Sequence, residues 1–200
     1  MFIQVITGRT SDREGLLQLA DRWQDELRPG ATGFLGSSGG VTDDGRFVLL
    51  ARFESEEAAR RNSARDQQGD WWSETEKYLE GVTFRDSTEV ITLLGGGSDA
   101  AGFLQVMRGR VTDPDKLDAV AARMPEFEAA MRKHRPDVIG EVIVMHADAS
   151  FTEVVYFASE AAARQGEAME APAEMQALFA DLMSATTIDE YLDLKDPWLR

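Results

Sequence analysis

The chain begins with a strand-like segment, Phe2-Ile3-Gln4-Val5-Ile6-Thr7-Gly8-Arg9, and the same pattern returns as Phe103-Leu104-Gln105-Val106-Met107-Arg108-Gly109-Arg110. A second pair of segments matches in the same order: Phe53-Glu54-Ser55-Glu56-Glu57-Ala58-Ala59-Arg60 returns as Phe157-Ala158-Ser159-Glu160-Ala161-Ala162-Ala163-Arg164. Single matches arise by chance in an acidic, alanine-rich chain, but an ordered series of matches does not. We therefore interpret the chain as two tandem copies of one fold.

The boundary between the two copies is a segment rich in glycine and serine. It reads Gly95-Gly96-Gly97-Ser98-Asp99-Ala100-Ala101-Gly102, a composition typical of a flexible linker. A phosphate-binding loop would need to join a strand directly to a helix and be followed by a Lys, and this segment does not have that context. We predict a first half over residues 1–97 and a second half over residues 98–200.

The pattern of each half predicts the order β-α-β-β-α-β. In the first half, residues 2–7 are apolar on both alternating faces, and Ser11-Asp12 can cap a helix that ends at Arg28-Pro29-Gly30. Two strands then flank an Asp-Gly turn, a second helix begins after Ser55, and further strands close the half. The remaining strands of the first half are expected at residues 34–41, 46–53, 82–84 and 89–94.

The second half repeats this order. Thr112-Asp113 and Pro114 predict the start of a helix, which Arg135-Pro136 ends, and Ser159-Glu160 predicts the start of the next one. Its hairpin and closing strands are expected at residues 141–146, 153–157 and 186–192. Two helices on one side of a sheet predict a ferredoxin-like α+β half.

A single half of this kind covers only one face of its sheet. The first strand of each half is apolar on both faces, which indicates that the second face is buried as well. Two halves meet this need if their antiparallel sheets pack against each other. We therefore expect an α+β fold in which two ferredoxin-like halves form an intramolecular, pseudo-dimeric barrel.

Composition excludes several classes of protein. The chain has 200 residues, a formal net charge of −15, no cysteine and two histidines. These values argue against disulfides, thiolate metal sites and a cysteine nucleophile, and the excess acid argues against a nucleic-acid partner. No apolar run is long enough for a membrane helix, and the first residues lack a basic leader. We expect a soluble cytoplasmic protein with no membrane partner, either a monomeric pseudo-dimer or a homodimer.

The most unusual stretch for chemistry is Asn62-Ser63-Ala64-Arg65-Asp66-Gln67-Gln68-Gly69-Asp70-Trp71-Trp72, with Tyr78 and Phe84-Arg85 after it. Adjacent tryptophans on a helix point about 100° apart, so both seldom join one core stripe. The second half has no aromatic residue in the corresponding stretch, Gly166-Glu167-Ala168-Met169-Glu170-Ala171-Pro172. The alternative interpretation is that the two tryptophans pack the core or the interface between the halves, as helical aromatics usually do.

The β-α-β-β-α-β halves, with a Phe-x-Ser-x-Glu-Ala-Ala start to the second helix, resemble the dimeric α+β barrel superfamily. The nearest branch is that of the antibiotic-biosynthesis monooxygenases (ABM), here as a tandem fusion. The resemblance implies a pocket between sheet and helices, lined by Asn, Trp, Tyr and Arg side chains. In such monooxygenases an electron-rich phenol or anthrone reacts with dioxygen without a cofactor. The residues of this chain that follow in that order are Asn62, Trp71, Trp72, Tyr78 and Arg85.

Other catalytic sites fit the sequence less well. The haem-degrading branch of the superfamily needs a helical histidine, and we expect His134 at a helix end and His146 at a strand end. Histidines and acids do not cluster at metal-ligand spacing, so we predict no metal and no cofactor. Gly36-Ser37-Ser38-Gly39-Gly40 matches the Gly-x-Ser-x-Gly elbow of hydrolases, but a strand follows it rather than a helix. These glycines more plausibly mark a bulge or a bend in a strand.

Three interpretations of the function stay open at this point. The first is a cofactor-free monooxygenase that acts on a small hydrophobic aromatic compound of the polyketide or quinol type. The second is a non-catalytic ligand-binding or stress-associated protein that uses the same pocket, and the third is a structural pseudo-dimer without a pocket. No general base stands out near the aromatic stretch, which weighs against the enzyme. A pocket beside Trp71 and Trp72 would favour the first two interpretations.

Overall fold

The computed structural model describes residues 1–173 and 175–200, and the chain divides into two compact units. The first unit consists of Met1–Val90 together with Asp196–Arg200, and the second consists of Ile91–Lys195. The units therefore differ from the halves expected at residues 97 and 98, because each sheet takes its short edge strand from the end of the other half. None of the helices in the described residues is long and apolar enough to cross a membrane.

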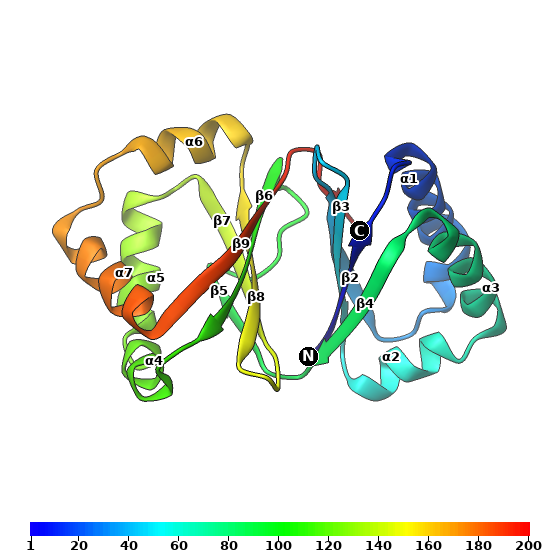
Figure 1. The fold of residues 1–200 in the computed structure, drawn as a ribbon, viewed down its shortest axis with the longest axis horizontal. Helices are drawn as coiled ribbons and strands as arrows, with labels where there is room; N and C mark the ends of the chain where they lie inside the picture. The colour runs from blue at the N-terminus through cyan, green and yellow to red at the C-terminus, as the bar shows by residue number, and fades with distance from the viewer. The chain divides into compact units, whose positions relative to one another are not determined.

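The first unit is a five-stranded antiparallel sheet with its helices on one face (Figure 1). The strand order is β10-β2-β3-β1-β4, and the four strands other than β10 have the order of a ferredoxin-like fold. The strands are β1 (Phe2–Arg9), β2 (Phe34–Val41), β3 (Arg46–Phe53), β4 (Glu80–Ser87) and β10 (Trp198–Leu199), and the helices are α1 (Arg13–Arg22), α2 (Glu56–Ser63) and α3 (Asp66–Thr75).

Helix starts in the first unit follow the side chains expected from the sequence. Asp12 accepts a hydrogen bond from the backbone N–H of Gly15 and caps α1. Ser55 does the same for the N–H of Ala58 at the start of α2. Such caps stabilise a helix end by about 1 kcal/mol each. The first helix does not run regularly to residue 27, because it changes at Trp23 into a five-residue π-helix, Trp23–Leu27.

The glycine-rich segment of β2 lies where other backbone comes close. A Cβ atom on Gly39 would collide with the backbone of β3, and one on Gly36 would lie 2.7 Å from the carbonyl oxygen of Arg200. Gly36 also follows a register shift in the pairing of β2 with β3 and has a φ of 136°, which side chains rarely adopt. The glycines therefore fit a bulged strand beside β10, in agreement with the rejection of a hydrolase elbow.

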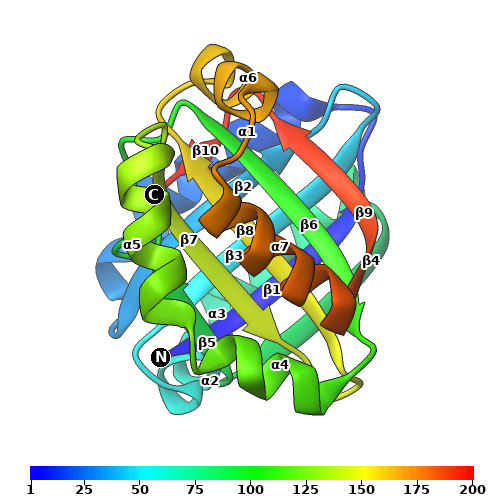
Figure 2. The same ribbon diagram turned by 90° about the vertical axis from the view of Figure 1, so that its left-hand side faces the viewer.

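The second unit repeats this architecture with the strand order β5-β7-β8-β6-β9. Figure 2 shows its helices lying across one face of the sheet. The strands are β5 (Val90–Leu93), β6 (Phe103–Val111), β7 (Val138–Met145), β8 (Ser150–Phe157) and β9 (Thr186–Leu194), and the helices are α4 (Pro114–Ala121), α5 (Met124–His134), α6 (Glu160–Ala168) and α7 (Ala173–Ala185). The fold class is therefore α+β with two tandem ferredoxin-like units, as expected.

The helix pattern of the second unit is interrupted where the sequence predicts continuous helices. The first helix is divided into α4 and α5, and Pro125 lies in the first turn of α5. Proline has no N–H to donate to the preceding turn, so a helix starts more easily at Pro125 than it runs through it. Pro172 likewise precedes α7. Register shifts of the same kind give Gly140 of β7 the position that Gly36 has in β2.

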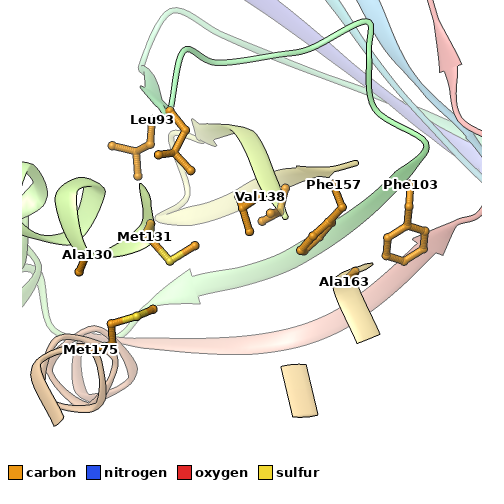
Figure 3. Close-up of a cluster of buried hydrophobic side chains, with 10 residues drawn as sticks. Leu93, Phe103, Ala130, Met131, Val138, Phe157, Ala163 and Met175 are labelled. Atoms are coloured by element: carbon orange, nitrogen blue, oxygen red, sulfur yellow. The ribbon is translucent and has the colours of Figure 1, made fainter. Parts of the chain in front are cut away.

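The core of the second unit lies between its sheet and helices. Figure 3 shows Phe103 and Phe157 from the sheet lying on the same side as Met131 and Met175 from the helices. The rings of Phe103 and Phe157 are 5.7 Å apart. These side chains are at most 5% exposed, and burying each stabilises the fold by roughly 1.5–3 kcal/mol.

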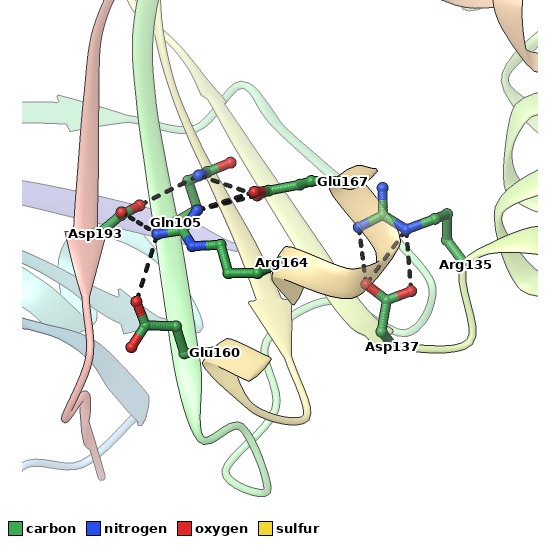
Figure 4. A network of polar contacts seen from close by, with 7 residues as sticks. All are labelled: Gln105, Arg135, Asp137, Glu160, Arg164, Glu167 and Asp193. Carbon is green, nitrogen blue, oxygen red and sulfur yellow. Dashed lines mark hydrogen bonds and ion pairs between the residues drawn. The ribbon is translucent and has the colours of Figure 1, made fainter. Parts of the chain in front are cut away.

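Figure 4 shows a network of charged and polar side chains in the second unit. Arg164 on α6 forms ion pairs with Asp193 and Glu167, and its guanidinium lies 5.1 Å from the ring centre of Phe103. Arg135 and Asp137 form a separate pair, with 2.8 Å between guanidinium nitrogen and carboxylate oxygen. The Arg164–Asp193 pair joins α6 to β9, whereas the Glu167 pair lies within α6 and the Arg135–Asp137 pair lies within the connection from α5 to β7.

Candidate functional site

A cavity of about 290 Å³ lies in the first unit between the sheet and the helices. This volume is near the lower end of the range of about 300–1,000 Å³ for small-molecule sites. Most lining side chains are apolar, and they come from β1–β4, α1, α2, α3 and the C-terminal segment. The lining residues are Gln4, Ile6, Leu16, Ala20, Trp23, Phe34, Ser37, Phe47, Leu49, Ala51, Phe53, Asn62, Ser63, Gln68, Gly69, Trp71, Trp72, Thr75, Phe84, Trp198 and Arg200.

All four tryptophans of the chain line this one cavity. Their rings belong to a series of aromatic contacts, with ring centres 6.4 Å apart for Trp23 and Trp71 and 6.1 Å apart for Trp71 and Trp72. The series continues to Phe84 on β4, whose ring centre is 5.1 Å from that of Trp72. Such walls offer flat apolar surfaces to a planar ring.

The adjacent tryptophans of α3 both line the cavity, and each contacts a different neighbouring element, α1 or β4. Trp71 donates its indole N–H to the backbone carbonyl of Leu19 on α1 at 2.8 Å, which fixes the ring beside that helix. Trp72 instead reaches Phe84 on the edge strand β4. Because neighbouring side chains on a helix point about 100° apart, Trp71 can contact α1 while Trp72 contacts β4. The two tryptophans therefore do more than fill one stripe of the core.

Two side-chain amides that are hydrogen-bonded to each other, Asn62 and Gln68, form one polar part of the cavity wall. Gln68 accepts hydrogen bonds at its Oε1 from the indole N–H of Trp23 at 2.7 Å and from the amide of Asn62 at 3.3 Å. Asn62, which is 6% exposed, also accepts a hydrogen bond from Arg65 at 2.9 Å. Arg65 in turn donates to the carbonyl of Leu27 at 3.0 Å, so the amide of Asn62 is held in one orientation. A positioned amide can donate to an oxyanion that forms on a bound substrate.

The C-terminal segment closes one side of the cavity through the short strand β10. Trp198 pairs with Gly39 of β2 and is 5% exposed, and its ring centre lies 6.1 Å from that of Phe47. Within the part of the chain that the structure describes, the buried indole N–H of Trp198 has no hydrogen-bond acceptor. An unpaired buried N–H costs about 1–3 kcal/mol. An oxygen atom of a molecule bound at this end of the cavity would supply the missing acceptor.

Arg200 is the one lining residue of ionisable type among the described residues. Its guanidinium forms an ion pair with Asp21 on α1, and its backbone exchanges two hydrogen bonds with Ser37 of β2, at 2.7 and 3.0 Å. The described lining contains no Asp, Glu, His, Lys, Cys or Tyr. The cavity therefore offers aromatic surfaces and neutral hydrogen-bond donors, but no side chain that could act as a general base at neutral pH.

The structure brings three of the five candidate residues together in this cavity. Asn62, Trp71 and Trp72 line it, whereas Tyr78 and Arg85 do not. Tyr78 follows α3 in a short 3-10 turn and lies beside Gly15 of α1, where a Cβ atom would collide with its ring. A catalytic role for any of the five stays a prediction, and only the first three are placed to touch a ligand in the cavity.

Arg85 lies on the opposite face of the sheet. In β4, Phe84 pairs with Ile6 of β1, and both line the cavity. Arg85 is the next residue and pairs with Val5, and successive side chains of a strand point to opposite faces. A shift of one residue along β4 therefore separates a cavity residue from one that cannot reach the cavity.

Four further cavity residues were missed by the sequence analysis. Trp23 follows Leu16 and Ala20 at helical spacing, a pattern that is typical of a core stripe. Gln68 has no distinctive spacing, although it lies within the unusual stretch. Trp198 and Arg200 are more than 100 residues away from the rest of the unit in sequence, so no local pattern indicates where they lie. The aromatic-basic ending Trp198-Leu199-Arg200 was the one available signal.

Two strand positions that line the cavity in the first unit are occupied by glutamates in the second unit. Glu141 on β7 and Glu153 on β8 occupy the register positions that Ser37 and Leu49 hold in the first unit. Glu141 is 4% exposed, and the two carboxyl groups share a hydrogen bond. Burial raises the pKa of Glu153 to about 7, and burial together with the neighbouring Glu153 raises the pKa of Glu141 well above its usual range.

Both histidines belong to the second unit. His134 is the last residue of α5 and His146 directly follows β7, so the two lie at the helix end and the strand end expected from the sequence. The ring of His146 is buried and forms a hydrogen bond of 3.0 Å with the hydroxyl of Thr152. In the described part of the chain no three His, Asp or Glu side chains gather where they could hold a metal ion.

The fold and the cavity together define an α+β protein of two ferredoxin-like units, the first of which has a ligand-sized aromatic cavity. No family model matches the chain, and no curated protein matches it in sequence. Solved structures do share its fold. A proposed monooxygenase from Lactobacillus acidophilus NCFM has a TM-score of 0.72 and 12% identity, with 100% of this chain and 98% of that chain covered.

Two other solved structures agree with this result. A proposed monooxygenase from Fusobacterium nucleatum subsp. nucleatum has a TM-score of 0.70 and 7% identity, with 96% of this chain and 89% of that chain covered. An anthrone oxidase-like protein has a TM-score of 0.62 and 11% identity, with 99% and 90% covered. The chain therefore shares its fold with these solved structures, as the resemblance stated from the sequence implies.

Proposed function

We propose that the first unit binds a small, planar, hydrophobic aromatic compound of the polyketide or quinol type and oxidises it with dioxygen, without a cofactor. The observation that carries the proposal is the cavity itself: four tryptophans and the held amides of Asn62 and Gln68 converge on about 290 Å³. The shared fold with monooxygenases supports the same proposal but leaves the substrate open.

The proposed reaction balances with dioxygen alone. On an anthrone-type substrate, the methylene carbon gains one oxygen atom as a carbonyl, and the other oxygen leaves with the two methylene hydrogens as water. The substrate anion supplies the electrons, so no external reductant is needed. In this scheme the tryptophans bind and orient the ring, and Asn62 donates a hydrogen bond to the developing oxyanion.

The side chains that line the cavity also determine where the substrate proton goes when the substrate anion forms. Because the described lining holds no carboxylate, histidine or tyrosine, the proton leaves to solvent or hydroxide rather than to a side chain. This restricts the proposal to substrates that ionise readily, such as anthrones and hydroquinones. Burial among aromatic rings keeps water away from the intermediate once it has formed.

Binding without turnover is the second candidate function. The missing general base favours it, since a ligand-binding or stress-associated protein needs the aromatic walls and the amides but no proton acceptor. The two functions share one cavity and differ in whether the bound compound then reacts with dioxygen. An experiment that measures both binding and oxygen consumption separates them.

The test uses the full chain with anthrone and with a hydroquinone under air, in an oxygen electrode and in the presence of a metal chelator. The proposal expects oxygen uptake that survives chelation and is lost in Asn62→Ala. Arg61→Ala is the matched control, because Arg61 is the preceding residue of α2 and is exposed. Binding measured by quenching of tryptophan emission, without oxygen uptake, would leave the second candidate and contradict catalysis.

A further inference from the structure

Most of the cavity wall is buried or half-buried, and its exposed lining residues indicate where the cavity opens. Three of the lining residues are exposed: Ser63 at the end of α2, Gly69 in α3, and Phe84 on the edge strand β4, which is 47% exposed. The opposite wall contains Trp198 and Phe47, both 5% exposed. The mouth of the cavity therefore lies by α2, α3 and β4, and the closed end lies at β10.

Gly69 is unusual among the glycines of the helices. It is the fourth residue of α3, and its N–H donates to the carbonyl of Arg65 at 3.1 Å, so its backbone is one that other residues adopt easily. A glycine inside a helix destabilises it relative to alanine. No turn or left-handed conformation at residue 69 requires glycine.

Close packing explains the other helical glycines but not this one. A Cβ atom on Gly15 of α1 would collide with Tyr78, and one on Gly166 of α6 would lie 2.5 Å from Arg135. A Cβ atom on Gly69 would meet nothing within 4 Å. The missing side chain thus leaves open space at the mouth of the cavity instead of making room for a neighbour.

We propose that Gly69 is the access position of the cavity: ligands pass through the space that its missing side chain leaves at the mouth by α2, α3 and β4. The size of residue 69 then determines how fast a ring enters and leaves, and therefore which ligands the cavity admits. Trp72 lies one helical turn further along α3, at the Phe84 contact, so a ring that passes Gly69 meets an aromatic surface at once. This inference rests on the proposed function in one respect, that the cavity admits a planar aromatic ligand.

The test compares Gly69→Ala with Gly69→Phe, using 2-naphthol as the probe and stopped-flow quenching of tryptophan emission as the signal. Gly69→Ala is expected to keep the association rate within about twofold of the wild-type rate. Gly69→Phe is expected to lower the association and dissociation rates together by about tenfold or more, with Kd nearly unchanged, because a narrowed passage slows both directions equally. Thermal melts confirm that both variants are folded.

Two results would contradict the proposal that ligands enter the cavity past Gly69. An unchanged association rate in Gly69→Phe means that ligands pass elsewhere, and a weakened Kd at an unchanged association rate means that residue 69 is a binding wall. Acrylamide quenching of tryptophan emission supplies a readout without any ligand. Gly69→Phe is expected to reduce its quenching constant relative to Gly69→Ala, and equal constants contradict the proposal. A wild-type protein that fails to bind 2-naphthol would count against the proposed function, while the acrylamide comparison would still decide the access route.

Discussion

Replacing Glu153 with glutamine should make the protein more stable at pH 8 than the wild type. Glu153 on β8 shares a hydrogen bond with Glu141 on β7, and burial raises the pKa of Glu153 from 4.5 to about 7. The folded state therefore holds a proton on Glu153 in a pH range where the unfolded chain has released it. Glutamine keeps the size of the side chain and a carbonyl oxygen that accepts the hydrogen bond from the Glu141 carboxyl, but it has no proton to lose.

The sign and size of the effect follow from the pKa difference. Because the folded state binds more protons than the unfolded state between pH 4.5 and 7, the contribution of Glu153 to stability is fully present below pH 4.5 and is lost as the pH rises through 7. A difference of about 2.5 pKa units corresponds to about 3 kcal/mol, at 1.36 kcal/mol per unit. Since Glu141 titrates together with Glu153, this figure is an upper bound for the single substitution.

The assay is urea unfolding at pH 4.5, 6 and 8, followed by far-UV circular dichroism. Tryptophan emission is unsuitable alone, since all four tryptophans belong to the first unit. The expected difference between Glu153→Gln and wild type is smallest at pH 4.5 and grows in favour of the variant towards pH 8. The control is Glu57→Gln at the start of α2, because hydrogen bonds from its own backbone N–H and from Ser55 lower the pKa of Glu57. A Glu153→Gln protein that is no more stable than wild type at pH 8 would refute the reasoning.

Three further predictions concern the first unit. Trp198→Ala should lower its free energy of unfolding by about 3–5 kcal/mol, and Trp198→Phe by much less, measured by urea unfolding with the remaining tryptophans as probes; a loss below 1 kcal/mol would contradict a buried wall at β10. Gly69→Ala should raise the free energy of unfolding by about 1 kcal/mol, and a loss would show that the glycine has a packing role. If the protein oxidises anthrones in this cavity, kcat/KM should rise with pH as the substrate ionises, with a midpoint that follows the pKa of each substrate. A midpoint that is the same for substrates of different acidity would indicate that a protein side chain outside the cavity lining acts as the base.

Much of the fold was predictable because its signals are local. The repeated strand at Phe2 and Phe103, the caps at Asp12 and Ser55 and the Asp-Gly turn each act over a few residues. The exchange of β5 and β10 between the sheets was missed, since adding a strand of two or four residues to an edge depends on contacts far apart in sequence. The helix breaks were missed because the apolar stripe continues through them.

The candidate site was predicted in part for a similar reason. The adjacency of Trp71 and Trp72 is a local anomaly, and it does mark the cavity wall. Arg85 was included because it is close in sequence, but the alternation of β4 turns it away from Phe84 and the cavity. Trp198 arrives at the same cavity from the other end of the chain, and only tertiary structure shows this.

The most direct test of the central claim is a crystal structure of the full chain soaked with a soluble hydroxyanthraquinone, which has the planar shape of an oxidised anthrone. We expect electron density for the ring system inside the cavity of the first unit, against Trp71 and Trp72, with an oxygen atom within hydrogen-bond distance of the Asn62 amide. An empty cavity at saturating ligand, or density bound only outside it, would contradict the claim that this cavity is the functional site.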